Sequence, residues 1–334
     1  MKAHNMTLTR LLSSLLAAVF FCVTAAVAAD AYPSRPVRLM VPYPAGGLSD
    51  AVARLFGTSM SAQLGQPVLV ENQGGAGGAI AAQKLLSSPA DGHYLFQGTP
   101  NELILAPLAN ASARYRAEDF RLVQLVAHSP IAILTRKDLP VGSVDDLVAL
   151  ARRSSDSGAP LTYGSVGVGS LYHLLAAHLG QRIGASLTHV PYKGGAPLMQ
   201  DLGGGQVDFA IVAYGPATVA MARQGRLKIL ASVGGTPPDG AGPLPSVHDS
   251  ALLKDFEFTI WSAYLVRSST PDDKVQRLQE VIAAALQEPD LRARLEAQGS
   301  ALAPPMSLQE SAKFLASESA RYRALAKSLG LQPQ

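Results

Sequence analysis

The sequence predicts an α/β protein of two lobes, and three features indicate this. The chain has 334 residues, 48% of them hydrophobic, which is more than one small core needs. Apolar strand-like runs alternate with amphipathic helical stretches, a pattern typical of parallel sheets covered by helices. Apolar runs at 120–135 and 256–266 mark the two passages between lobes. We therefore expect lobe I to comprise 30–128 and 262–334, and lobe II to comprise 129–261.

The first 29 residues have the pattern of a secretory signal peptide. Two basic residues precede an apolar run, 11–23, and small residues follow up to Ala28 and Ala29, where we expect cleavage. A membrane anchor is the alternative, but the run is shorter than the ~20 apolar residues of a spanning helix. Cys22 lies in this run, so the mature chain has no cysteine for disulfides, thiol catalysis or zinc ligation. We expect a periplasmic protein.

Charge and motif patterns exclude several classes of partner. The net charge is +3, with 28 basic and 25 acidic residues interspersed, so the sequence has no basic stripe for nucleic acid. Histidine and carboxylate residues do not occur at metal-ligand spacing, and no cofactor motif is present. No heptad pattern predicts a dimer, so we expect a monomer without cofactor or metal.

Strands and helices alternate in the first part of lobe I. We expect a helix that is capped by Ser49 or Asp50 and ends at Gly65. Around it we expect strands over 37–41, 68–71 and 94–97 and a second helix over 79–86. Ligands of such sheets gather at the carboxyl ends of strands, so Thr99, in a predicted loop over 99–102, is a candidate contact.

The remaining elements follow the same reasoning. Ser170 is the expected N-cap of a helix with a buried leucine stripe. Further strands are expected over 120–126, 131–135, 161–163, 187–190, 209–212, 227–233 and 256–266. Further helices are expected over 143–153, 215–224, 272–286, 290–297 and 308–329.

The stretch VPYPAGGLSD at 41–50 organises the first lobe. A strand breaks at Pro42, a flexible turn follows, and polar residues begin a helix. A helix N-terminus presents unpaired backbone N–H groups and the positive end of the helix dipole, so it holds an anion without a basic side chain. The candidate ligand contacts here are Tyr43, Ala45, Gly46, Gly47, Ser49 and Asp50.

A second stretch of the same design, GSVGVGSLYHL, occurs at 164–174. Neither stretch is a nucleotide motif, because Tyr172 stands where G-x-G-x-x-G requires its third glycine. Each glycine-rich turn taken alone is more often structural. Together they predict a two-sided clamp for a carboxylate. The candidate contacts here are Ser165, Gly167, Gly169, Ser170 and His173.

A catalytic alternative uses the same second stretch. Ser165 and Ser170 lie near His173 in the sequence, but the nucleophile elbow G-x-S-x-G is absent. We therefore expect no enzyme, with a secreted hydrolase or transferase using Ser170 and His173 as the alternative. Trp261 and Tyr43 are either core aromatics or the apolar wall of a cleft.

Several of these motifs occur together in one family. The sequence resembles the Bug (TctC) family of periplasmic solute-binding receptors of tripartite tricarboxylate transporters, from Tyr32 to about Gln332. The matching stretches are YPSRPVRLMVPYPAGGLSDAVARL, GQPVLVENQGGAGG, GSVGVGSLYHL, VPYKGGAPLMQDLGGGQVD and FEFTIWSAYLVRSSTP.

The resemblance implies a type II periplasmic-binding-protein fold, in which two α/β lobes joined by two crossing strands close over a small carboxylated solute. The ligand would be a di- or tricarboxylate or an aromatic acid, and membrane permease subunits would be partners. Engagement of a membrane sensor is an alternative role. The contact loops of the family match Tyr43 to Asp50 and Ser165 to Ser170 with His173.

The sequence also departs from the family pattern. Leu48 and Ser49 replace smaller or different residues in the first loop, which narrows its mouth. Where many members carry an acidic or polar residue facing the cleft, Val212 and Ala213 precede Tyr214, which is a further candidate ligand contact. The missing acidic group argues against an amino acid ligand. The segment before the return strand, GPLPSVHDSALLKDFEF, also departs from the proline and threonine run that is usual in the family.

Overall fold

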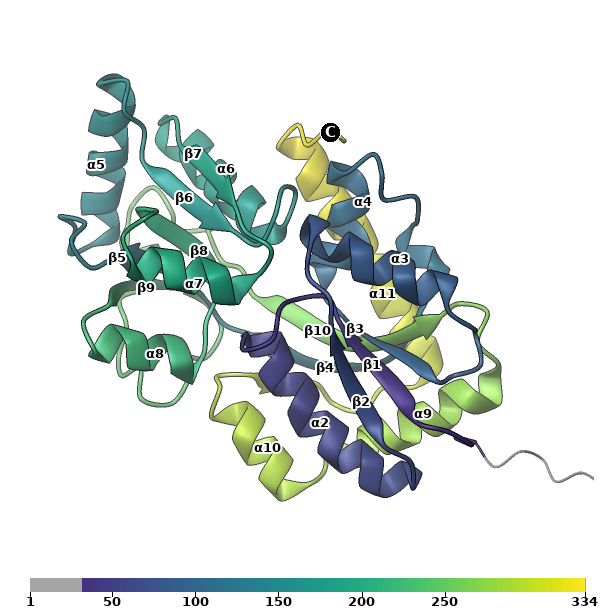
Figure 1. Cartoon of the computed structure of the whole chain (residues 1–334). Coiled ribbons are helices and arrows are strands. Elements are labelled where there is room, and N and C mark those ends of the chain that lie inside the picture. Colours follow the sequence, from purple (N-terminus) through teal and green to yellow (C-terminus); the bar gives the residue numbers. More distant parts are fainter. Residues whose placement is uncertain (1–31, 334) are drawn as a thin grey trace, which may run out of the picture.

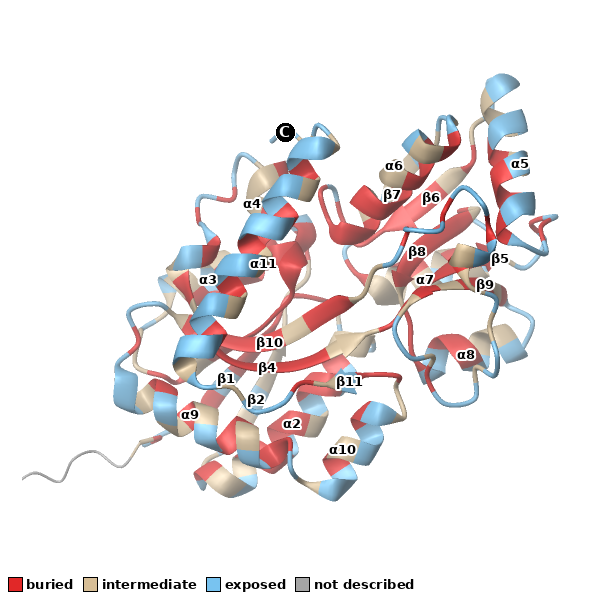
Figure 2. Cartoon of the chain, turned by 180° about the vertical axis from the view of Figure 1, so that it is seen from behind, coloured by how far each residue is buried: buried red, intermediate tan, exposed pale blue. Residues whose placement is uncertain are grey.

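A computed structural model describes residues 32–333, which form two α/β lobes, each built around its own sheet (Figure 1). The predicted signal peptide lies outside these residues. Buried residues line the strands and the inner faces of the helices, while the outer faces of the helices are exposed (Figure 2). The expected α/β class with two lobes is confirmed. None of the described helices is long and apolar enough to cross a membrane.

The sheet of lobe I has six strands in the order β11-β4-β10-β3-β1-β2. β1 (Val37–Val41) runs parallel to β2 (Val68–Asn72) and β3 (Tyr94–Gly98). β10 (Ile260–Arg267) is antiparallel to both β3 and β4 (Phe120–Ser129). β11 (Ala301–Leu302) is the edge strand beside β4, and β2 is the other edge strand. The sheet is therefore mixed, and the expected parallel pattern holds for its first three strands.

Helices cover both faces of this sheet (Figure 1). One face carries α2 (Leu48–Leu64), α9 (Asp272–Ala285) and α10 (Pro289–Glu296). The other face carries α3 (Ala79–Ser87), α4 (Ala106–Ala109) and α11 (Leu308–Ser328). Between the layers the largest buried side chains include Phe56, which meets the ring of Tyr264 edge to face at 5.1 Å.

The sheet of lobe II has five strands in the order β7-β6-β8-β5-β9. Its strands are β5 (Ile131–Arg136), β6 (Thr162–Ser165), β7 (Thr188–Pro191), β8 (Phe209–Ala213) and β9 (Leu227–Gly234). β6 is parallel to β7 and β8, and β5 is antiparallel to β8 and β9. Its helices are α5 (Val144–Asp156), α6 (Leu171–Ile183), α7 (Gly195–Gly203) and α8 (Pro216–Arg223).

Two neighbouring strands lie at the passage between the lobes. β4 ends at Ser129, and after Pro130 the chain enters β5 of the second sheet. β10 begins with Ile260 paired to Ser129, antiparallel to β4. The sheet membership of these strands favours lobe limits near 128 and 262, which stay a prediction.

The start of α2 differs from the prediction. Gly47 is the N-cap, without a side-chain hydrogen bond, and the helix begins at Leu48. The expected cap was Ser49 or Asp50. Asp50 does not cap because its carboxylate, in the first turn, accepts a hydrogen bond from the amide of Gly46 instead, at 3.0 Å. The prediction was wrong by two or three residues, and this carboxylate fixes the turn in front of the helix.

Three other differences concern long-range contacts. The return strand begins at Ile260, four residues later than expected, because Phe256 instead packs against Phe258 and the ring of His178. The predicted loop at 99–102 leads into a π-helical turn, η2 (Asn101–Leu105), which continues as α4. Helix α7 was not expected at all.

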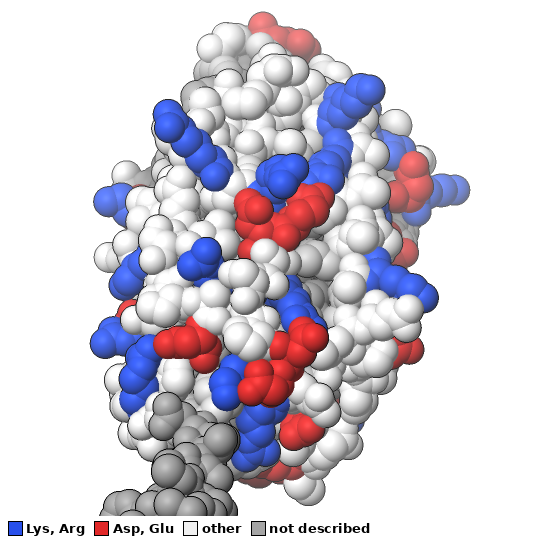
Figure 3. Space-filling view, turned by 90° about the vertical axis from the view of Figure 1, so that its right-hand side faces the viewer, with Lys and Arg blue, Asp and Glu red and all other residues white. Residues whose placement is uncertain are grey.

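Acidic and basic side chains alternate over the face of the molecule shown in Figure 3. Exposed ion pairs of the described residues include Arg323 with Glu118 at 2.8 Å and Arg35 with Asp91 at 2.7 Å. Exposed pairs of this kind contribute little to stability, on the order of 0–1 kcal/mol each. The charges in this view form no continuous basic patch.

Candidate ligand-binding site

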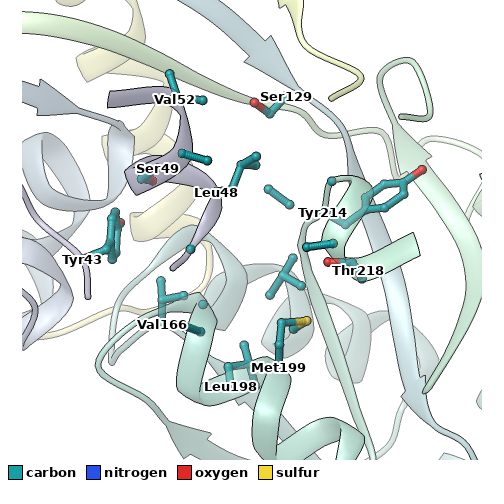
Figure 4. Close-up of a pocket in the computed structure, with 18 of the residues that line it drawn as sticks. Tyr43, Leu48, Ser49, Val52, Ser129, Val166, Leu198, Met199, Tyr214 and Thr218 are labelled. Carbon is teal, nitrogen blue, oxygen red and sulfur yellow. The ribbon is translucent and has the colours of Figure 1, made fainter. Parts of the chain in front are cut away.

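A cavity of about 590 Å³ lies between the two lobes. Lobe I contributes the start of α2, the end of β3 and the first residues of β10. Lobe II contributes α7 and the segment from the end of β8 through α8. Figure 4 shows Leu48 and Ser49 on one side of the cavity, with Leu198, Met199 and Thr218 on the other. Both lobes therefore contact any molecule in this cavity.

The turn before α2 is held in shape by Asp50. Its carboxylate accepts hydrogen bonds from the amide of Gly46 at 3.0 Å and from Nε of Arg54 at 3.1 Å. Burial raises the pKa of Asp50, but these hydrogen bonds outweigh burial and the net pKa is lowered. Gly46 itself has a φ of +87°, a conformation that suits glycine.

This arrangement places the first residues of α2 at the cavity. Gly47, Leu48 and Ser49 all line it, and the first N–H groups of a helix have no partner within the helix. The amide of Gly46 is already used by Asp50. The start of α2 is therefore an uncharged donor site that attracts an anion.

A buried polar network supports the loop from below. The hydroxyl of Tyr43 donates to Oε2 of Glu102 at 3.0 Å and accepts from Nδ2 of Asn101 at 3.1 Å. Thr99 donates to Glu102 through its hydroxyl at 2.9 Å and also through its amide. Glu102 is fully buried, and burial raises its pKa to about 8, although these hydrogen bonds partly oppose the shift. Tyr43, Thr99 and Asn101 line the cavity, and Glu102 holds them together.

Asn101 also connects the lobes. Its Oδ1 accepts a hydrogen bond of 2.7 Å from the amide of Leu171, the first residue of α6. The start of α6 therefore donates one amide to lobe I and not to the cavity. This contact exists only while the lobes lie against each other.

The glycines of the second predicted loop pack between the lobes. A Cβ added to Gly169 would lie 1.9 Å from Cβ of Ala109 in α4. A Cβ added to Gly167 would lie 3.1 Å from the amide nitrogen of Gly77. Both glycines have positive φ, +142° for Gly167 and +75° for Gly169. These positions allow the backbones of the two lobes to approach closely.

The polar residues of the second loop bond to their own loop. The hydroxyl of Ser170 caps α6 by accepting from the amide of His173, as predicted, and Nδ1 of His173 accepts from the amide of Gly169 at 2.9 Å. The buried hydroxyl of Ser165 lies 2.6 Å from Nε2 of His189. The ring of His173 stacks on His189 at 4.0 Å, and burial lowers the pKa of both imidazoles. Within residues 32–333, the Ser170 hydroxyl has no hydrogen bond to an imidazole nitrogen, which the hydrolase alternative requires.

The structure thus divides the predicted site residues into two groups. Those that line the cavity are Tyr43, Gly46, Gly47, Ser49, Thr99, Tyr214 and Trp261. Those that do not line it are Ala45, Asp50, Ser165, Gly167, Gly169, Ser170 and His173. From the second loop region, Val166 and Tyr172 reach the cavity instead.

Two of the predicted aromatic residues, Trp261 and Tyr214, differ in their polar atoms. The indole N–H of Trp261 donates to Oε2 of Glu318 in α11 at 2.7 Å, so its ring is fixed. The hydroxyl of Tyr214 has no partner among the described residues. Figure 4 shows its ring directed away from Leu48 and Ser49. Both residues are 1% exposed and serve as packed wall.

Sequence reasoning missed the part of the site formed by α7 and α8. The side chains concerned are Leu198, Met199, Gln200, Thr218, Met221 and Arg226. A signal was present, since Leu198 and Leu202 are four residues apart and both fully buried on one face of α7. The glycines on both sides of this short stretch concealed the helix. Among the described residues, no group of three or more metal-ligating side chains forms a metal site.

Two lobes around a cavity with helix amides, and no acidic side chain among its described lining residues, define a two-lobed solute-binding protein. The family model of the tripartite tricarboxylate transporter family receptor (TctC) matches residues 52–331. The chain belongs to this family, which confirms the resemblance.

Individual relatives agree over nearly the whole chain. Protein BugT of Bordetella pertussis is 32% identical over 337 residues, covering 97% of this chain and 99% of its own. The structure of R. palustris Rpa4515 with adipate is 30% identical, with a TM-score of 0.83, covering 91% of this chain and 100% of that one. The structure of MatC from Rhodopseudomonas palustris with bound malate is 28% identical, with a TM-score of 0.80, covering 88% and 99%. The periplasmic-binding-protein fold is thus confirmed.

Proposed function

We propose that this chain is an extracytoplasmic receptor that binds a small carboxylate between its lobes and delivers it to a membrane transporter of the tripartite type. The observation that carries the proposal is the start of α2, where Gly47, Leu48 and Ser49 line the cavity and their amides have no partner within the helix. Relatives with bound adipate and malate support a carboxylate ligand.

Binding would use amides where many anion sites use basic side chains. The three amides donate charge-assisted hydrogen bonds to a carboxylate, and the positive end of the helix dipole adds to the attraction. Asp50 keeps the donors in place, because its ionised carboxylate is bonded to the turn and to Arg54. A receptor of this kind releases its solute without any covalent step, so no catalytic residue is needed.

A thermal-shift screen tests the proposal. Monocarboxylates, dicarboxylates, tricarboxylates, aromatic acids and nicotinate are added to the purified chain. A matching acid at a hundredfold excess over its dissociation constant should stabilise the folded state by ~2.7 kcal/mol. Trp261 lies in the cavity wall and gives a second, fluorescent readout. A broad panel that changes neither the melting temperature nor the fluorescence would contradict a carboxylate receptor.

The transporter and the location are separate parts of the proposal. We infer that the chain is exported and cleaved near Ala28 or Ala29, which mass spectrometry of the periplasmic fraction tests directly. Delivery to permease subunits predicts that deletion of the permease abolishes uptake of the bound acid. If uptake persists and the liganded protein instead associates with a membrane sensor, the signalling role replaces transport.

A further inference from the structure

The two ends of the cavity differ in chemistry. At one end, the amides of Gly47, Leu48 and Ser49 form the uncharged anion site described above. Arg226, which follows α8, also lines the cavity and is its only charged lining residue within 32–333. No described carboxylate lies within ion-pair distance of this guanidinium. Arg226 is thus an exposed cation without an acidic partner.

Helix α7 runs from one end of the cavity to the other. A Cβ added to Gly194, its N-cap, would lie 2.6 Å from Cδ of Pro44 in the first loop. A Cβ added to Gly203, its last residue, would lie 3.8 Å from Nη2 of Arg226. Nine helical residues span roughly 13 Å at 1.5 Å per residue. The distance between the two anion-attracting ends is therefore close to the length of this helix.

The space between the ends is lined by apolar side chains. Leu198 and Met199 of α7 face Leu48 across the cavity (Figure 4). Met221 of α8 continues this lining near Arg226, since a Cβ added to Gly203 would lie 3.0 Å from Cε of Met221 and 3.8 Å from Nη2 of Arg226. A Cβ added to Gly215, at the start of α8, would lie 3.3 Å from Cδ1 of Leu48. A second carboxylate placed in this middle region would lose its water without gaining a partner, which is costly. The same carboxylate at Arg226 would gain a cation and stay partly hydrated.

We propose that the solute is an elongated acid with a carboxylate at each end of an apolar chain, and that Arg226 holds the second carboxylate. The inference rests on the proposed function, because it takes the amides of α2 as the site of the first carboxylate. The methionines at 199 and 221 suit a flexible chain, since their side chains adapt to its shape. Compact polyacids such as citrate fit this arrangement poorly.

Isothermal titration with three acids tests the ligand class. Suberate and octanoate have chains of equal length and differ only in whether the far end is a carboxylate or a methyl group. Succinate has both carboxylates but is too short to reach both ends. We expect suberate to bind most tightly, octanoate more weakly, and succinate more weakly than suberate.

A pair of variants tests the role of Arg226. Arg226→Gln should weaken suberate binding about fivefold, the upper range for an exposed ion pair, and leave octanoate binding within about twofold. Arg223→Gln is the matched control: Arg223 lies three residues away, does not line the cavity, and donates to the carbonyl of Gly240. It should change neither affinity. Suberate affinity should also fall more steeply with salt than octanoate affinity.

The possible failures are distinguishable. If octanoate or succinate binds as well as suberate, or if Arg226→Gln affects suberate and octanoate equally, the inference is wrong while carboxylate binding stands. If no acid in the series or in the broad panel binds, the proposed function fails together with the inference.

Discussion

At the residue scale, Asn101 is the residue that most directly links the cavity to the closure of the lobes. It joins Tyr43 of the first loop to the amide of Leu171 in lobe II. In Asn101→Ala, the hydroxyl of Tyr43 and the amide of Leu171 both lose their hydrogen bond to this side chain in the closed interface. An unmade buried hydrogen bond costs about 1–3 kcal/mol, so we expect affinity for a bound acid to fall by roughly five- to a hundredfold.

Calorimetry with the best acid of the screen measures this effect. Gln83→Ala serves as control, because Gln83 donates to the carbonyl of Ser112 within lobe I and does not line the cavity. Equal affinities for Asn101→Ala and the unchanged protein would show that this bond does not support closure.

Glu102 gives a prediction about pH. Burial raises its pKa from 4.5 to about 8, so the folded state holds this proton more tightly than the unfolded chain. The resulting stabilisation is fully present below pH 4.5 and is lost as pH rises through about 8. In Glu102→Gln, which is neutral at every pH, this loss is absent.

Melting temperatures of both proteins between pH 6 and 9 test the prediction. The unchanged protein should lose stability relative to Glu102→Gln as the pH rises. Profiles that stay parallel over this range would show that the pKa of Glu102 is not raised. If the unchanged protein instead gains stability relative to Glu102→Gln as the pH rises, the ionised carboxylate is the form that the fold stabilises.

At the scale of elements, the loop before α6 is shaped by its contact with α4. Gly169 has a φ of +75° and lies directly against Ala109, so Gly169→Ala adds both strain and a clash. Gly184→Ala is the matched control, since Gly184 has a φ of +63° but open space around it. Strain alone costs about 1–2 kcal/mol in either variant.

We therefore expect both variants to lose similar stability but only Gly169→Ala to bind acids at least about tenfold more weakly, because the added methyl group holds the lobes apart. Denaturation and calorimetry on the same samples separate the two effects. If both variants keep full affinity, the close approach at Gly169 is not needed for binding.

Most elements could be predicted from local pattern, and the failures have a common cause. The strand at 37–41 is a short apolar run, and the helix from Leu308 follows a capping box at Ser307, so their limits are right to within a residue. The turn at 101–105 and the role of Gly169 depend on partners far away in the sequence. The glycines at 167 and 169 therefore resembled ligand loops, although they lie against lobe I.

The candidate site divides in the same way. The first loop was found because a strand, a glycine turn and a helix start are local signals, and Gly47 and Ser49 do line the cavity. Arg226 was not found, because an isolated arginine after a short helix has no distinguishing pattern. Its place beside Gly203 follows only from how α7 and α8 pack.

At the scale of the whole molecule, the lobes lie in a closed arrangement. Gly74 of lobe I approaches the carbonyl of Lys193 in lobe II, and an added Cβ would lie 2.9 Å from that oxygen. Gly167 against Gly77 and Asn101 against Leu171 add to the same interface. A solute in the cavity contacts both lobes, so it favours this closed state over any open one.

Small-angle X-ray scattering tests this prediction. Without ligand, opening lets water reach the amides at the start of α2, so we expect a larger radius of gyration than in the closed structure. A saturating acid should reduce it to the closed value, because only the closed state completes both walls of the cavity. The Gly169→Ala variant should keep the larger radius of gyration at the same acid concentration, since the added methyl group meets Ala109 and keeps the lobes from closing. The comparison uses an acid that calorimetry has shown to bind. If the scattering is identical with and without this acid, the lobes are already closed in the free protein.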